Sequence, residues 1–202
     1  MALCFTHTAA GYLAYEAVRP ADRHRPALLG AAVLLANGAD VDFLPGILIG
    51  QPGVFHRGVT HTLAAVLAVA AVAWLVGRWR ARPGWPATRA AWWAGAIYTS
   101  HLLLDFVTTD SRPPFGGRFL WPLSNAYYLA PVTPLPEIVI DPSDRGAFLH
   151  SLVEPHTAVI WAGEVATLLA VVVAVHALRA VLATPPEPAG EIAPVGEVAD
   201  PP

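Results

Sequence analysis

Charged side chains are scarce in this sequence of 202 residues. They make up 13% of the chain, whereas soluble domains usually carry about a quarter. Hydrophobic residues make up 55%, and the mean hydropathy is +0.49. These values favour a membrane protein. No basic stripe is interleaved with aromatic residues, so we expect no nucleic-acid partner.

Cysteine is almost absent as well. The single residue, Cys4, excludes an internal disulfide framework and a thiolate cluster. Any metal site must therefore be built from histidines and carboxylates. The first residues also lack the basic region and the small-residue cleavage site of a signal peptide, so we expect the first helix to belong to the mature fold.

Long apolar stretches are what the sequence has instead. They cover residues 3–18, 27–49, 61–79, 90–109 and 157–182. They predict an all-α fold, a polytopic membrane helical bundle of about five apolar helices, the first of which is short for a full span. An extramembrane segment of about 45 residues, 110–155, is rich in Pro, Gly and aromatics and is predicted to cap the bundle. Residues 1–183 form one predicted domain, and 184–202 a disordered tail rich in Pro and Glu.

Arginines in the short loops predict the orientation of the bundle. Loops rich in positive charge stay on the cytoplasmic side during insertion. The first and third loops are the rich ones, and the second contains only Arg57. The rich loops hold Arg19, Arg23, Arg25, Arg78, Arg80, Arg82 and Arg89. We therefore predict an integral protein of a bacterial-type inner (plasma) membrane, with its N-terminus outside and its C-terminus inside.

Histidines and aspartates interrupt the apolar stretches at one depth. With the predicted orientation, all of them fall in the outer half of the bilayer: His7, Asp40, Asp42, His56, His61, His101 and Asp105. His101 and Asp105 are four residues apart, so a helix projects both from one face. A carboxylate at this depth costs several kcal/mol, by estimates that vary widely, and coordination to a cation offsets that cost. The pattern predicts a metal site that faces the outer side.

Asp40 and Asp42 raise a geometric objection to a single site. Two residues apart on an ideal helix, their side chains point in different directions, about 200° apart. Gly38 and Pro45 lie close by and would relieve the objection by breaking the helix.

The combined order of these motifs resembles a known family. The motifs are Thr6-His7, Asp40-Val41-Asp42, the run from His56 to His61 (HRGVTH), His101-Leu-Leu-Leu-Asp105 and a following FLWPLS. Over residues 1–125 the chain is similar to the membrane-bound metal-dependent hydrolases called YdjM-like or DUF457. The resemblance implies hydrolysis with the help of a metal but names no substrate.

A more distant similarity is to the zinc-dependent phospholipase C and P1 nuclease group, which holds clustered zinc ions. By that likeness the metal ligands would be His7, Asp42, His61, His101 and Asp105, with Asp105 bridging two ions. His150 and Glu154 would correspond to a further HxxxE element of that group, and whether they join the site stays open. This chain departs from the group in its membrane helices and in lacking a processed N-terminus to donate an amine.

We expect from these patterns a hydrolase that uses one or two divalent ions, most simply zinc, on a lipid-like or phosphoester substrate. Asp40 or His56 would orient or deprotonate a water molecule, and Arg57 would steady an anionic substrate. The partner expected besides the substrate is the lipid bilayer. The alternative is a non-enzymatic membrane protein whose His/Asp site is structural or handles ions. A transporter usually carries ionisable groups through both halves of the bilayer or has paired repeats, and this chain shows neither.

Overall fold

The computed structural model describes residues 4–20, 24–80 and 84–183. Its helices, with 3-10 turns written η, are α1 (Cys4–Glu16), α2 (Pro26–Ala36), η1 (Gly38–Asp42), α3 (Phe43–Leu48), η2 (Val59–His61), α4 (Leu63–Trp79), α5 (Ala87–Phe106), α6 (Arg145–Ser151) and α7 (Pro155–Ala183). Within these ranges the chain forms no strand, only two isolated bridges. The predicted all-α fold class is therefore confirmed.

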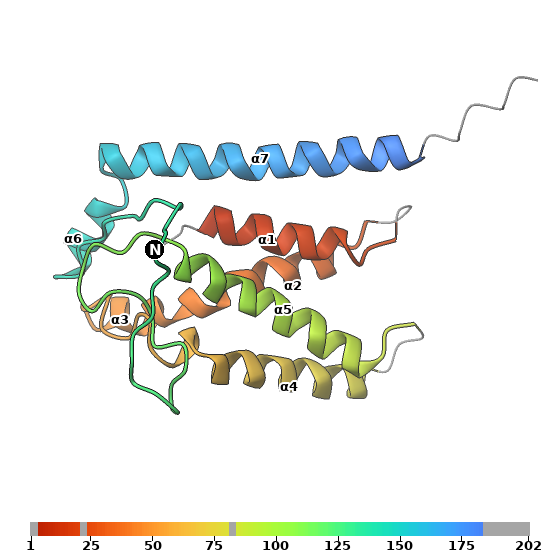
Figure 1. Cartoon of the computed structure of the whole chain (residues 1–202), viewed down its shortest axis with the longest axis horizontal. Helices are drawn as coiled ribbons and strands as arrows, with labels where there is room; N and C mark the ends of the chain where they lie inside the picture. Colours follow the sequence, from red (N-terminus) through yellow and green to blue (C-terminus); the bar gives the residue numbers. More distant parts are fainter. Residues whose placement is uncertain (1–3, 21–23, 81–83, 184–202) are drawn as a thin grey trace, which may run out of the picture.

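Four helices lie side by side along the long axis of the molecule, and α7 runs next to them (Figure 1). The central helix α5 contacts α4, α1 and α2, whereas α7 contacts α1. At one end of the bundle lie α3, α6 and the irregular chain between α5 and α6; the turns after α1 and α4 lie at the other end.

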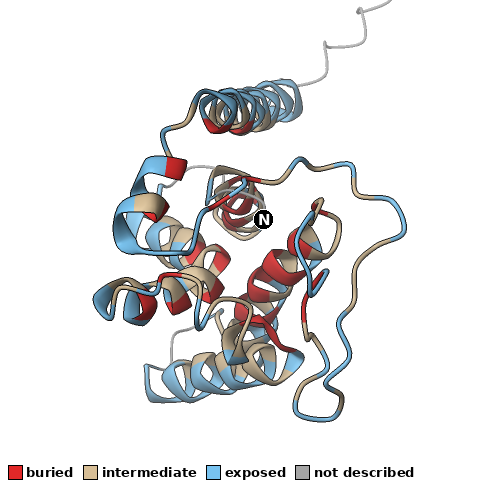
Figure 2. Cartoon of the chain, turned by 90° about the vertical axis from the view of Figure 1, so that its left-hand side faces the viewer, coloured by how far each residue is buried: buried red, intermediate tan, exposed pale blue. Residues whose placement is uncertain are grey.

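Small residues set the close contact between α1 and α2. A Cβ atom added to Gly11 would lie 2.8 Å from the carbonyl oxygen of Ala32 and 2.9 Å from Cβ of Ala36. Small side chains at this crossing let the two backbones approach. Tyr15 and Ile97 complete this part of the core. Figure 2 shows the buried residues gathered between α1, α2 and α5, while much of the surface of α7 is exposed.

The predicted second span, 27–49, is not one continuous helix. α2 ends at Ala36, and the chain from Gly38 to Leu48 continues at an angle of 63° to it. At the break, Nδ2 of Asn37 donates to the carbonyl oxygen of Val33 and to the hydroxyl of Thr8, so this side chain ties the end of α2 to α1. The break that the sequence suggested near Gly38 is therefore present, and it begins directly after α2.

Length and composition support fewer membrane spans than the five predicted. Within the described residues, α7, with 29 residues, is long and apolar enough to cross a membrane by itself, and the bent pair of α2 with the segment Gly38–Leu48 would be a second span. α4 is apolar but has only 17 residues. Five spanning helices are thus not confirmed. The predicted tail, 184–202, lies outside the described residues.

Candidate metal centre

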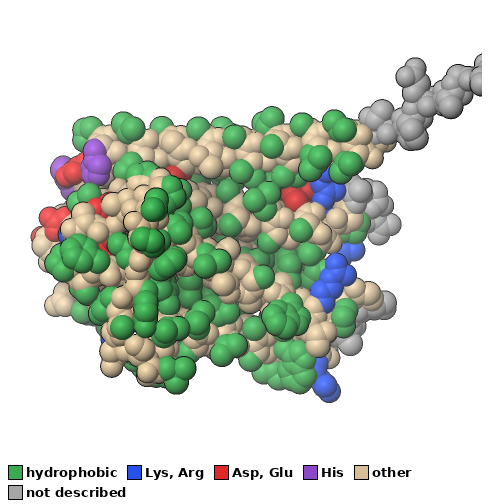
Figure 3. Space-filling model, viewed as in Figure 1, with side chains coloured by type: hydrophobic (Ala, Val, Ile, Leu, Met, Phe, Trp, Pro, Cys, Tyr) green, Lys and Arg blue, Asp and Glu red, His purple; other side chains and the backbone are tan. Residues whose placement is uncertain are grey.

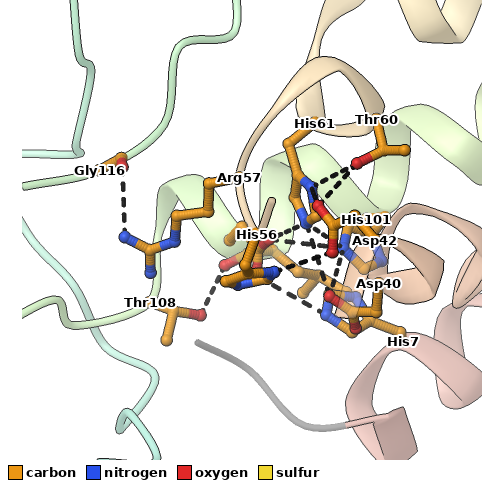
Figure 4. Close-up of polar contacts among 12 residues, drawn as sticks. His7, Asp40, Asp42, His56, Arg57, Thr60, His61, His101, Thr108 and Gly116 are labelled. Atoms are coloured by element: carbon orange, nitrogen blue, oxygen red, sulfur yellow. Dashed lines mark hydrogen bonds and ion pairs between the residues drawn. The ribbon is translucent and has the colours of Figure 1, made fainter. Parts of the chain in front are cut away.

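Histidines and aspartates from four parts of the chain meet at the end of the bundle where α1 begins and α5 ends (Figure 1), and Figure 4 shows their side chains. They come from the start of α1, from η1, from the chain that leads into α4, and from the last two turns of α5. The members are His7, Asp40, Asp42, His56, His61, His101 and Asp105, and we call them the cluster. The imidazoles of His7, His61 and His101 are at most 1% exposed. The break after α2 brings both aspartates of η1 into contact with His61.

Two imidazole nitrogens and two carboxylate oxygens of the cluster lie close together. They are Nε2 of His61, Nε2 of His101, Oδ1 of Asp40 and Oδ2 of Asp105. The two nitrogens are 3.3 Å apart, and each oxygen lies 3.4–3.6 Å from both of them. Zinc holds N and O ligands at about 2.0–2.2 Å, and a tetrahedron of that radius places its ligand atoms about 3.3–3.6 Å apart. Each oxygen therefore has, together with the two nitrogens, the spacing of three ligands in a tetrahedral zinc shell.

Polar contacts at Nδ1 fix the orientation of three imidazoles of the cluster, those of His56, His61 and His101. Nδ1 of His101 lies 2.8 Å from the carbonyl oxygen of Ala36, which can only accept, so Nδ1 carries the proton. Asp42 serves His61 and His56 in the same way, with one carboxylate oxygen 3.1 Å from Nδ1 of each ring. The Thr60 hydroxyl donates to Asp42 at 2.8 Å. Such outer hydrogen bonds fix the tautomer and the orientation of metal-binding histidines.

Asp40 and Asp42 thus occupy different places. The carboxylate oxygens of Asp42 already have protein partners, namely His56, His61 and the Thr60 hydroxyl. Asp40 presents Oδ1 to the Nε2 atoms of His61 and His101. The geometry favours Asp40 as the ligand and Asp42 as the residue that orients two histidines, the reverse of the roles expected from the distant similarity.

Unpartnered atoms test whether these residues fit a metal. The described residues contain nine buried side-chain atoms without a hydrogen-bond partner, and six of them belong to His7, Asp40, His56 and Asp105. Each buried, unpaired polar atom costs about 1–3 kcal/mol. A proton shared between two of these atoms would leave the others unpaired, whereas metal ions accept several donors at once. The donor set, imidazole nitrogens and carboxylate oxygens, is one that zinc binds.

His7 extends the cluster toward a second group of ligands. Its ring stacks on that of His101 with centroids 3.8 Å apart, and its Nε2 lies 3.7 Å from Oδ1 of Asp105. In the set of His7, His101 and Asp105, and in the set of Asp40, His56 and His61, the ligand atoms lie within 4.8 Å of one another. The two oxygens of Asp105 therefore face different histidines, as a carboxylate that bridges two ions would.

The positive charge around the cluster comes from imidazoles. In the described part of the chain, the ion pairs of Asp40, Asp42 and Asp105 go to histidines alone. Arg57 instead pairs with Asp110 and donates to the carbonyl oxygen of Gly116 at 3.2 Å. Its φ of 59° is in the left-handed region, which is uncommon for a residue with a side chain.

His150 and Glu154 lie apart from the cluster. His150 pairs with Glu154 at 3.4 Å, and the second ion pair of Glu154 goes to His156 at 3.9 Å. The His150 side chain is 76% exposed. The structure thus leaves the further HxxxE element outside the candidate site. Sequence reasoning missed the hydrogen-bond partners Thr60, Asp110 and Ala36; Thr60 stands inside HRGVTH, but a backbone carbonyl has no sequence signal.

A cleft of about 1100 Å³ reaches the cluster at Asp42 and His56. His56 stacks on Phe43, with ring centroids 3.9 Å apart, and its Nε2 is among the unpartnered atoms. Burial lowers the pKa of His56 below its ordinary value, although its hydrogen bond to Asp42 acts in the opposite direction. Arg57 lines the same cleft. His56, expected to orient or deprotonate water, and Arg57, expected to bind an anionic group, therefore line the same cleft.

The fold and the cluster define a class: a helical membrane protein with a buried centre of histidine and aspartate at one end of its bundle. The chain belongs to the YdjM inner membrane protein family, whose model matches residues 1–184. This confirms the resemblance inferred from the motifs.

One curated relative is the inner membrane protein YbcI of Escherichia coli (strain K12). The two sequences are 36% identical over 110 residues, which cover 52% of this chain and 60% of that protein. The chain thus matches less than two thirds of this relative. No solved structure matches the chain.

Proposed function

We propose that the protein is a membrane-bound metal-dependent hydrolase that acts on a lipid-like or phosphoester substrate. The observation that carries the proposal is a pair of imidazole nitrogens 3.3 Å apart with a carboxylate oxygen of Asp40 and one of Asp105 each 3.4–3.6 Å from both nitrogens, beside a cleft large enough for a substrate. His61, His101, Asp40 and Asp105 would hold a zinc ion, and His7 with the second oxygen of Asp105 would contribute to another.

The remaining residues of the site have complementary roles in this proposal. A bound zinc ion would polarise the scissile bond and lower the pKa of a water molecule toward 7. His56 accepts a proton from the water through its unpartnered Nε2, and Asp42 holds that ring through Nδ1. The water oxygen bonds to the phosphorus or carbonyl carbon, the ester bond breaks, and the departing alkoxide takes up the proton that His56 accepted. Arg57, in the cleft wall, faces the anionic group.

The outer side of the inner membrane is the proposed location of the site. Most of the Lys and Arg side chains seen in Figure 3 lie at the right-hand end of the molecule, and the cluster lies toward the other end. Arg78 is in the last turn of α4, Arg89 is near the start of α5, and Arg179 is near the end of α7. The rule that positive loops stay in the cytoplasm then directs the cluster outward.

A structural metal centre is the second candidate, and one observation favours it. Two imidazoles and two carboxylates are available to one ion, and four protein ligands are the pattern of structural zinc sites, whereas catalytic sites keep one position open. In that case the ion would fasten η1, η2 and α5 to each other without chemistry.

Hydrolysis assays on zinc-loaded protein in detergent separate the two candidates. The substrates are bis(4-nitrophenyl) phosphate and phosphatidylglycerol, and the variants are His56→Ala and, as a matched exposed control, His150→Ala. We expect turnover by the wild type and by His150→Ala. In His56→Ala, turnover falls about 10²–10⁴-fold while the metal content stays unchanged. Wild-type protein that is folded and metal-loaded but cleaves no ester would overturn the hydrolase proposal and leave the structural centre.

A further inference from the structure

The cleft beside the cluster is lined by large apolar side chains that are accessible to solvent. The residues are Val41, Leu44, Leu48, Val54, Phe55 and Val59. The exposed fraction of their surface ranges from 47% for Phe55 to 77% for Leu48. A small water-soluble phosphoester has no group that would bury these surfaces. A hydrocarbon chain would bury them, and burying apolar area contributes roughly 25 cal/mol for each Å².

The position of α3 gives this apolar surface access to the bilayer. α3 follows the 63° bend after α2 and exposes Leu44 and Leu48, which also line the cleft. The chain belongs to a family of inner membrane proteins, so lipid surrounds it. A large apolar patch of this kind marks contact with a membrane or another apolar partner.

Positive charge also lines the cleft. It comes from Arg57, Arg112 and Arg118. Arg57 is ion-paired with Asp110, whereas Arg112 and Arg118 form no ion pair within residues 4–20, 24–80 and 84–183. Three acidic residues line the cleft: Asp42, Asp110 and Glu137. Both carboxylate oxygens of Glu137 accept a hydrogen bond from the backbone N–H of Ser111. Guanidinium groups match the geometry of phosphate oxygens.

We propose that the substrate is a phosphate-bearing membrane lipid. Its hydrocarbon chain would lie against the apolar side chains of the cleft, and its phosphate would lie near Arg112, Arg118 and the cluster. The inference rests on the proposed hydrolase function and narrows its substrate to an amphiphile taken from the bilayer. Asp42 and His56 belong both to the cleft lining and to the cluster, so the bound phosphate lies next to the groups that would cleave its ester.

Photolabelling tests this inference through binding, independently of turnover. The probe is phosphatidylglycerol with a diazirine at the end of one acyl chain, added to detergent-purified protein, and the labelled peptides are mapped by mass spectrometry. A diacylglycerol with the same labelled chain tests the contribution of the phosphate. Val54→Trp fills the cleft, and Val173→Trp is its matched control, since Val173 is 66% exposed on α7. Metal content and hydrolysis of bis(4-nitrophenyl) phosphate are measured on the wild type in parallel.

We expect the label in residues 41–59 of the wild type, about ten-fold less label there in Val54→Trp, and no change in Val173→Trp. The diacylglycerol should label the same segment about ten-fold less than phosphatidylglycerol, because it lacks the anion. Label spread evenly over α4, α5 and α7, or equal labelling of Val54→Trp and wild type, would overturn the lipid inference. If bis(4-nitrophenyl) phosphate is still cleaved in that case, the hydrolase proposal survives. Label in the cleft without cleavage of any ester supports the lipid site and removes the hydrolase.

Discussion

The different places of Asp40 and Asp42 yield a sharp prediction about metal affinity. Asn keeps the size of Asp but lacks its negative charge. In Asp42→Asn the rings of His56 and His61 each lose a charged acceptor now 3.1 Å from Nδ1. Loss of such an outer partner typically lowers metal affinity 10–100-fold, which corresponds to about 1.4–2.7 kcal/mol. In Asp40→Asn the candidate metal ligand itself loses its negative charge, and we expect a larger fall in metal affinity.

Competition with a zinc-binding dye in detergent measures both affinities on the same scale. The expected order is wild type, then Asp42→Asn, then Asp40→Asn. A tight site in Asp40→Asn together with complete loss of zinc in Asp42→Asn would refute the assignment. The ligand set would then be the one that the distant similarity to zinc-dependent phospholipases implies.

Three further predictions concern stability in detergent. Chelation of the metal should lower the free energy of unfolding by about 4 kcal/mol relative to protein with free zinc at a thousand times its dissociation constant, and equal melting temperatures would contradict this. Gly11→Leu should cost about 1–3 kcal/mol by forcing α1 and α2 apart, whereas Gly30→Leu, where an added Cβ meets nothing within 4 Å, should cost little; equal melting curves would refute the close contact. Glu16→Gln weakens the ion pairs to Arg19 and Arg179 at 2.7 and 2.6 Å and should cost about 1.5–3 kcal/mol, measured as unfolding in increasing SDS.

The sequence predicted the helices near the cluster well where the signal was local. Apolar runs placed α4 and α5 within a few residues, and the spacing of His101 and Asp105 on one helix needed only the helical repeat. Gly38 and Pro45 pointed to a break in the second apolar stretch, and the structure has one directly after Ala36. The contact of the Asn37 side chain with Thr8, 29 residues away in sequence, could not be predicted from local pattern.

The division of roles inside the cluster could not be read from residue types. Asp40 and Asp42 are chemically identical, and only the folded chain brings Asp42 against Nδ1 of His56 and His61. It brings Asp40 against Nε2 of His61 and His101. Arg57 looked available to a substrate, but its main partner, Asp110, is 53 residues distant. Long-range pairing of this kind depends on packing that local patterns do not encode.

Elemental analysis of detergent-purified protein tests the central claim most directly. We predict one or two zinc ions per chain in the wild type and in His150→Ala, whose side chain lies outside the cluster, and loss of metal in His101→Ala and Asp105→Ala. A folded wild-type protein that binds no metal even after incubation with zinc would contradict the claim, and the buried histidines and aspartates would then be a network held together by protons.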